Sequence, residues 1–160
     1  MGRGQARVGL DLPIGARRSQ RTMSETLTIE EWRRAENCRR VAHLCLQHGF
    51  YADAISRSYY AVLHSAKAAL ALYDVASRRH RALSNLFGHH IVMTGMVERH
   101  WGSVVGRLAD LRRVADYDVS VVFSEADAAG VYGQADAFVS RIHALLTDTI
   151  APDRLRQPRS

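Results

Sequence analysis

The chain has 160 residues, enough for one domain, and its 47% hydrophobic and 24% charged residues are typical of globular proteins. No apolar run approaches the roughly 20 residues that span a bilayer, and the arginine-rich N-terminus lacks an uninterrupted apolar stretch, so we expect neither a membrane span nor a secretory signal. The net charge of +6 belongs to the two ends, because residues 1–22 carry +4 and residues 151–160 carry +2.

The same ends hold all three prolines, Pro13, Pro152 and Pro158. We therefore expect a basic, disordered N-terminal extension over 1–24, a helical domain over 25–150 and a disordered basic tail over 151–160. Met23 opens a segment that resembles a natural start, so residues 1–22 are interpreted as an upstream extension. Such tails either add non-specific phosphate affinity or are solvated ends.

The first predicted helix begins at Thr28, where Thr28 and Glu31 have the spacing of a capping box, and Gly49 ends it. The second runs from about Ala52 to Tyr73. Its core positions recur at helical spacing and form one apolar seam: Ile55, Tyr59, Val62, Ala66, Ala69 and Tyr73.

A third helix is predicted over roughly 79–93 and a fourth over 97–115, followed by a connection over 116–123. Ser124 then resembles a helix start, and the fifth helix has apolar residues at helical spacing from Val131 to Leu145. These elements predict an all-α protein, a single five-helix up-and-down bundle.

Arg57 and His64 lie seven residues apart on the second helix, which places them on one face within roughly 20°. This face lies opposite the apolar seam. One interpretation is metal-independent phosphodiester cleavage, with the imidazole moving a proton and the guanidinium holding the phosphate. The other is a structural pair that is bonded to carboxylates or carbonyls of neighbouring helices.

A second constellation closes the fourth helix, where Arg112 and Arg113 precede Asp116 and Tyr117. It is either a charge cap at the negative end of the helix dipole or a corner that contacts phosphate or a base. His80 is a candidate supporting residue. No metal or other cofactor is expected, because neither CxxC nor HExxH is present. Cys38 and Cys45 are interpreted as buried thiols of a reducing cytoplasm.

Three motifs in order resemble one branch of the HEPN superfamily. The helix that contains Ser56-Arg57, Tyr59-Tyr60-Ala61 and His64 resembles its S-R-x-Y-Y-A-x-x-H-A pattern, and Leu111-Arg112 with Ala115-Asp116-Tyr117 resembles its L-R-x-x-A-D-Y corner. The third motif comprises Leu86 to His90 with Thr94-Gly95, and the resemblance spans about residues 28–147.

The resemblance implies a helical bundle, often a homodimer, encoded beside a nucleotidyltransferase partner in a prokaryotic toxin–antitoxin or RNA-processing module. Many such proteins are metal-independent endoribonucleases with an R-x(4–6)-H motif, whose form Arg57 and His64 match, with Tyr60 as a supporting residue. In the nuclease branches that motif usually lies in a later helix, where this chain has Ala115 and Asp116. Either catalysis has moved to Arg57 and His64, or this branch has lost it. Tyr117 matches a tyrosine that the partner modifies in related systems.

The sequence therefore predicts a cytoplasmic HEPN-type protein that cleaves RNA. The alternative is a non-catalytic module that binds a nucleotide or a protein through the Arg57/His64 face.

Overall fold

The computed structural model describes residues 14–75 and 80–156, with the side chains of 80 and 81 left out of the description. Over these ranges the chain is helical and contains no strand: α1 (Ile14–Gln47), α2 (Tyr51–Leu72), α3 (His80–Phe87), α4 (Val104–Tyr117), α5 (Glu125–Thr147) and α6 (Pro152–Arg156). A π-helical turn, η1 (Gly88–Val92), follows α3, and a 3-10 turn, η2 (Arg99–Ser103), precedes α4. The prediction of an all-α bundle is confirmed.

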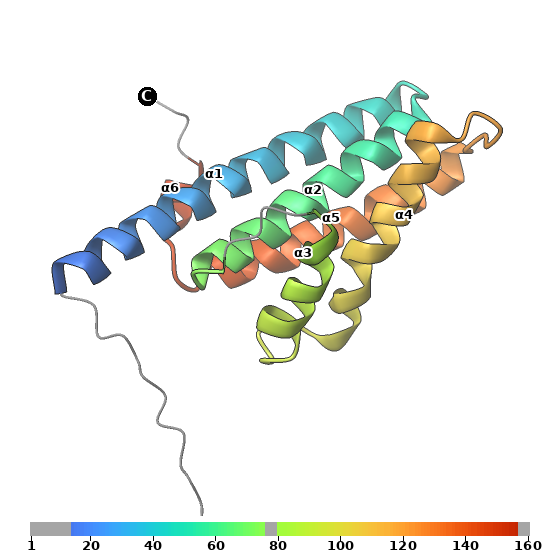
Figure 1. The fold of residues 1–160 in the computed structure, drawn as a ribbon. Helices are drawn as coiled ribbons and strands as arrows, with labels where there is room; N and C mark the ends of the chain where they lie inside the picture. Colours follow the sequence, from blue (N-terminus) through green and yellow to red (C-terminus); the bar gives the residue numbers. More distant parts are fainter. Residues whose placement is uncertain (1–13, 76–79, 157–160) are drawn as a thin grey trace, which may run out of the picture.

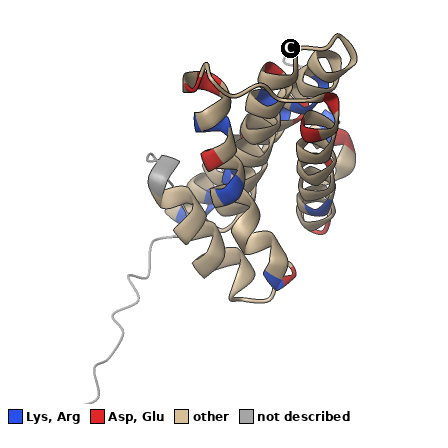
Figure 2. Ribbon diagram, turned by 90° about the vertical axis from the view of Figure 1, so that its right-hand side faces the viewer, with Lys and Arg blue, Asp and Glu red and all other residues tan. Residues whose placement is uncertain are grey.

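The three long helices α1, α2 and α5 lie side by side, and α3 and α4 pack across them (Figure 1). Helix α2 has its most extensive contacts with α1, α5 and α4, so it is the centre of the bundle. The positions of basic and acidic residues, blue and red in Figure 2, are both spread over several helices. No helix in the described part of the chain is long and apolar enough to cross a membrane.

The predicted seam of α2 is buried from Ile55 to Ala69, whereas Tyr73, beyond the helix end, is 38% exposed. The opposite face is also covered in part, because Ala61, Ala68 and Ala71 are at most 4% exposed. These small side chains let neighbouring helices approach closely. The polar residues of the same face, Arg57, Tyr60 and His64, form a partly exposed polar strip that meets α1 at Glu31 and α4 at Arg112.

The predicted start of the first helix at Thr28 is wrong, because α1 begins at Ile14. Thr28 is fully buried inside the helix, and its Oγ1 donates to the carbonyl of Ser24 at 2.9 Å. A threonine hydroxyl can bond the preceding turn of a helix as well as cap a new one, so the local pattern is ambiguous. Residues 14–24, which we assigned to a disordered extension, are instead the first turns of α1.

The other helix ends follow local signals more closely. Helix α1 stops at Gln47, two residues before Gly49, whose φ of +79° is readily adopted by glycine. The predicted cap of the fifth helix is confirmed: Ser124 accepts from the backbone N–H of Asp127, and the Asp127 carboxylate accepts from Ser124. Residues 118–123 before it are non-helical, as predicted, whereas Asp116 and Tyr117, which we assigned to the same connection, are the last residues of α4.

The C-terminal segment also differs from the expected disordered tail, since residues 152–156 form α6. Pro152 is its first residue, a position that proline favours because its ring presets the helical φ. Leu155 is only 2% exposed, and Arg154 forms an ion pair with Glu25 of α1. The segment is therefore packed against the bundle near the middle of α1 (Figure 1).

Candidate functional site

His64 lies on the polar strip of α2 and pairs with Glu31 of α1. Its imidazole Nδ1 is 2.6 Å from Oε2 of Glu31, and the two side chains are 15% and 13% exposed. Burial opposes ionisation of the Glu31 carboxyl, but the hydrogen bond from His64 and the charges of His64 and Lys67 outweigh it, so the pKa of Glu31 lies below its ordinary value. An ionised Glu31 therefore accepts from the Nδ1–H of His64 and fixes the orientation of the ring.

One helical turn before His64, Tyr60 connects this pair to α4. The rings of Tyr60 and His64 are stacked with their centroids 6.4 Å apart. The Tyr60 hydroxyl accepts a 3.0 Å hydrogen bond from Arg112, whose guanidinium carbon also lies 5.4 Å from the centre of the Tyr60 ring. A guanidinium and an imidazole from different helices thus flank one tyrosine.

Arg112 is itself held by its own helix. Its Nε lies 2.7 Å from the Oδ2 of Asp116, one turn later. That Nε is buried and has no aligned hydrogen-bond partner among the described residues, so the contact is an ion pair of imperfect geometry. The guanidinium carbon is also 5.7 Å from the centre of the Tyr117 ring, although Tyr117 is 72% exposed.

The structure therefore joins two groups of residues that the sequence predicted separately. His64 and Tyr60 come from α2, and Arg112, Asp116 and Tyr117 come from the end of α4. We call these five residues and Glu31 the His64 cluster. Arg113 is outside it, because its side chain is 69% exposed and pairs with Asp110 on the solvent face of α4.

Arg57 shares the α2 face with His64 but lies two turns away and is exposed. Its charge acts instead on Cys38 and Cys45, two free cysteines. Burial raises the pKa of both thiols, and the positive charge of Arg57 opposes that rise. Arg112 is connected to the His64 ring by way of Tyr60, whereas the charge of Lys67 acts on the Glu31 carboxyl that pairs with His64.

His80 is the first residue of α3, but its side chain lies outside the described residues. Other histidines make ring contacts away from the cluster, His89 with His90 and His143 with Trp32. Among the described residues, no group of three or more histidine, cysteine or acidic side chains has an arrangement that could hold a metal ion.

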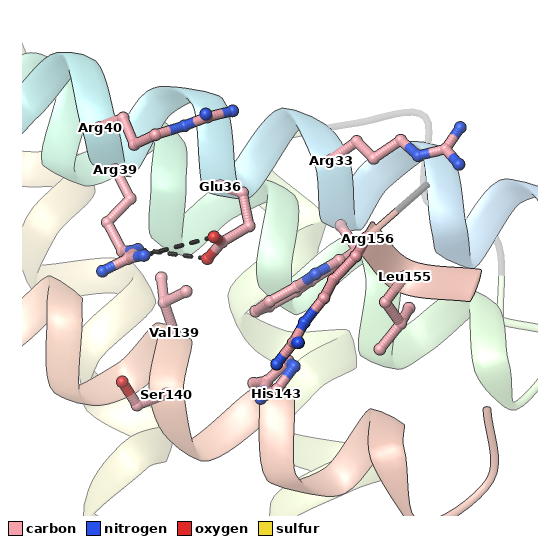
Figure 3. A pocket seen from close by; sticks show the side chains of 10 residues that line it. Arg33, Glu36, Arg39, Arg40, Val139, Ser140, His143, Leu155 and Arg156 are labelled. Atoms are coloured by element: carbon pink, nitrogen blue, oxygen red, sulfur yellow. Dashed lines mark hydrogen bonds and ion pairs between the residues drawn. The ribbon is translucent and has the colours of Figure 1, made fainter. Parts of the chain in front are cut away.

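The sequence analysis did not identify Glu31 as a site residue, because it interpreted this glutamate as the partner of Thr28 in a capping box at a helix start. It also missed a pocket of about 670 Å³ between α1, α5 and α6. Figure 3 shows basic side chains around this pocket. The sequence feature that could have indicated this pocket is the presence of two Arg-Arg pairs on one helix, Arg33-Arg34 and Arg39-Arg40.

Comparison with known proteins agrees with this architecture. The sequence model of the family described as HEPN domain matches residues 29–145. A candidate toxin of Methanocaldococcus jannaschii is 31% identical over 116 residues, which cover 72% of this chain and 86% of the relative. A UPF0332 protein of Thermotoga maritima is 30% identical over 121 residues, 75% of this chain and 92% of the relative. A second candidate toxin of M. jannaschii is 22% identical over 92 residues, 58% and 63% of the two chains.

Proposed function

Because the chain belongs to the HEPN domain family, we propose that it is the toxin-like component of a prokaryotic toxin–antitoxin or RNA-processing module and cleaves RNA without a metal ion. Two similar proteins named as candidate toxins support the first part. The proposed partner is a nucleotidyltransferase-type antitoxin, and the proposed place of action is the cytoplasm.

The observation that carries the nuclease proposal is the contact between His64 and Glu31. In its neutral form, the His64 imidazole donates Nδ1–H to the ionised carboxylate and keeps the lone pair of Nε2 for accepting a proton. The carboxylate also stabilises the imidazolium that forms when the proton arrives. This arrangement suits a general base, and the guanidinium of Arg112 contacts Tyr60, whose ring stacks with the imidazole.

The proposed reaction is an internal transesterification. Nε2 of His64 takes the proton of a ribose 2′-hydroxyl, and the 2′-oxygen attacks the adjacent phosphorus. The bond from phosphorus to the 5′-oxygen breaks, and that oxygen is protonated by an imidazolium. The products are a 2′,3′-cyclic phosphate and a 5′-hydroxyl end. Arg112 offsets the charge that develops on the phosphoryl oxygens, and Arg57 extends the basic strip along the strand.

A homodimer would supply the second proton-transfer group. Attack and departure take place on opposite sides of the phosphorus, so one imidazole is poorly placed to serve both. The polar strip of α2 is partly exposed between α1 and α4, and two strips facing each other would bring two copies of His64 into one groove. We therefore propose a face-to-face homodimer as the active form.

The second candidate function is a non-catalytic module that binds a nucleotide or a protein through the Arg57/His64 face. It is favoured by the ion pair itself, because a histidine bonded to a partly buried glutamate is also a common structural arrangement. The two candidates differ in whether RNA is cut.

The experiment is cleavage of a mixed cellular RNA pool by the purified full chain in chelator, comparing the wild type with His64→Ala and Arg57→Ala. We expect cleavage that survives chelation, leaves cyclic phosphate ends and is lost in His64→Ala. Arg57→Ala should cleave about tenfold more slowly, as expected for loss of one phosphate contact.

Circular dichroism of each variant shows whether it is folded. A folded, dimeric wild type that leaves RNA intact in chelator would refute the nuclease proposal and favour the binding module. Cleavage retained by a folded His64→Ala would place the chemistry elsewhere.

A further inference from the structure

The pocket between α1, α5 and α6 has a strongly basic lining. Four arginines and one carboxylate contribute to it: Arg33, Arg39, Arg40, Arg156 and Glu36. This pocket is separate from the His64 cluster, because none of the cluster residues lines it. Its volume of about 670 Å³ lies within the range of small-molecule sites, roughly 300–1,000 Å³.

The single carboxylate of the lining is already engaged. Glu36 accepts from both Nε and Nη2 of Arg39 at 3.2 and 3.3 Å, and Arg39 also reaches Asp136 at 2.9 Å. Burial disfavours the charged form of Arg39, but its hydrogen bonds to Asp136 and Glu36 outweigh this and hold its pKa above the ordinary value. The positive charge of Arg39 is thus balanced by Glu36 and Asp136, and the remaining three guanidinium groups give the pocket its positive charge.

Besides the basic lining, a second observation, at Arg33, indicates an anionic ligand. Its Nε is buried, and no described residue accepts a hydrogen bond from it. A buried donor without an acceptor destabilises the fold. An oxygen-rich anion in the pocket would supply the acceptor.

The positions of the guanidinium groups indicate how many anionic groups the ligand carries. Arg33 and Arg40 are seven residues apart on α1, about 10 Å along the axis. Figure 3 shows them at separate places along the helix, while Arg156 reaches from α6 toward His143. Buried Leu155 anchors the short helix that carries Arg156. Planar guanidinium groups bind phosphate oxygens in pairs, so three separated groups suit successive phosphates better than a single one.

We propose that this pocket binds a run of phosphate groups, as found in a polyphosphate chain or in the backbone of a single RNA strand. Arg33, Arg40 and Arg156 contact the phosphates, and the stacked pair of Trp32 and His143, with ring centroids 5.1 Å apart, forms the adjoining wall. This site is independent of the proposed cleavage chemistry.

The test measures binding of two probes to the full chain: tripolyphosphate, by calorimetry, and a fluorescent 2′-O-methyl RNA decamer, by anisotropy. The decamer cannot be cut through its 2′ position, so failure of the nuclease proposal does not affect the measurement. The variants are Arg33→Gln/Arg40→Gln and, on the other wall, Arg156→Gln. The matched control is Arg99→Gln/Arg107→Gln, which removes the same charge from exposed positions.

We expect the Arg33→Gln/Arg40→Gln protein to bind at least one probe about tenfold more weakly, with a smaller loss for Arg156→Gln and wild-type binding for the control. For RNA, the slope of log K against log salt should fall by about 1.4, which corresponds to two phosphate contacts. Provided that the pocket variants bind more weakly than the control, a loss for both probes, for RNA alone or for tripolyphosphate alone each supports the proposal and identifies the source of the phosphates.

Two results would overturn the proposal. One is a wild-type protein that binds neither probe. The other is an equal loss of affinity in the folded pocket variants and in the control, because net charge alone would then account for binding.

Discussion

Nδ1 of His64 on α2 lies 2.6 Å from Oε2 of Glu31 on α1, a residue 33 positions earlier in the chain. This contact fixes the orientation of the imidazole ring of the proposed base. It also joins α1 and α2, the pair of helices with the most extensive contact in the bundle. It also gives the folded protein a carboxylate whose pKa is below its ordinary value, with measurable consequences for stability.

The first prediction concerns acid unfolding. A carboxylate with a lowered folded pKa stabilises the fold above its unfolded value, 4.5, and the contribution is lost as the pH falls through the lower folded value. Glu31→Gln removes this titration. The variant should lose less stability than the wild type between about pH 6 and pH 3 in urea unfolding followed by circular dichroism. Asp148→Asn, at an exposed position, should keep the wild-type dependence. An unchanged acid dependence in Glu31→Gln would show that the pair does not stabilise the fold.

The second prediction concerns Arg112. Arg112→Lys keeps the charge but loses the planar fork that reaches the Tyr60 hydroxyl and Asp116. We expect a loss of about 1 kcal/mol of stability and about tenfold slower RNA cleavage. Arg107→Lys, on the exposed face of the same helix, serves as the control and should change neither quantity. Full activity of Arg112→Lys would mean that the guanidinium geometry is not used in the reaction.

The third prediction concerns α6. Leu155 is 2% exposed, so Leu155→Ala should lower the free energy of unfolding by about 2–4 kcal/mol. Ile14→Ala, which truncates an aliphatic side chain that is 88% exposed, should have almost no effect. Equal stability of the two variants in thermal unfolding would mean that the C-terminal segment does not pack on the bundle in solution.

The fourth prediction concerns the cap of α5. Ser124→Ala removes the hydroxyl that accepts from the Asp127 N–H and donates to the Asp127 carboxylate, and it leaves the backbone N–H of Ser124 in place. It should destabilise the protein by about 1 kcal/mol. Ser140→Ala, an exposed serine inside the same helix, provides the comparison. A loss of stability no larger than that of Ser140→Ala in urea unfolding would contradict the capping role.

Some features of this fold follow from residues within one or two helical turns. The spacing of Ile55, Tyr59 and Val62 predicted the buried seam of α2, and Ser124 with Asp127 predicted the start of α5. These signals are local because backbone hydrogen bonds and caps join residues three or four positions apart. The same kind of signal failed at Thr28, whose hydroxyl bonds the preceding turn of a longer helix.

The sequence by itself therefore determined the helical class and the core face of α2, and it predicted His64 and Arg112 as candidate site residues. Only the tertiary structure decided their partners. Glu31 meets His64 because α1 packs on α2, Arg112 meets Tyr60 across 52 residues, and Arg154 reaches Glu25 across 129. Which side chains meet depends on how the helices are rotated and packed, and that is set by the burial of the whole apolar surface rather than by any short pattern.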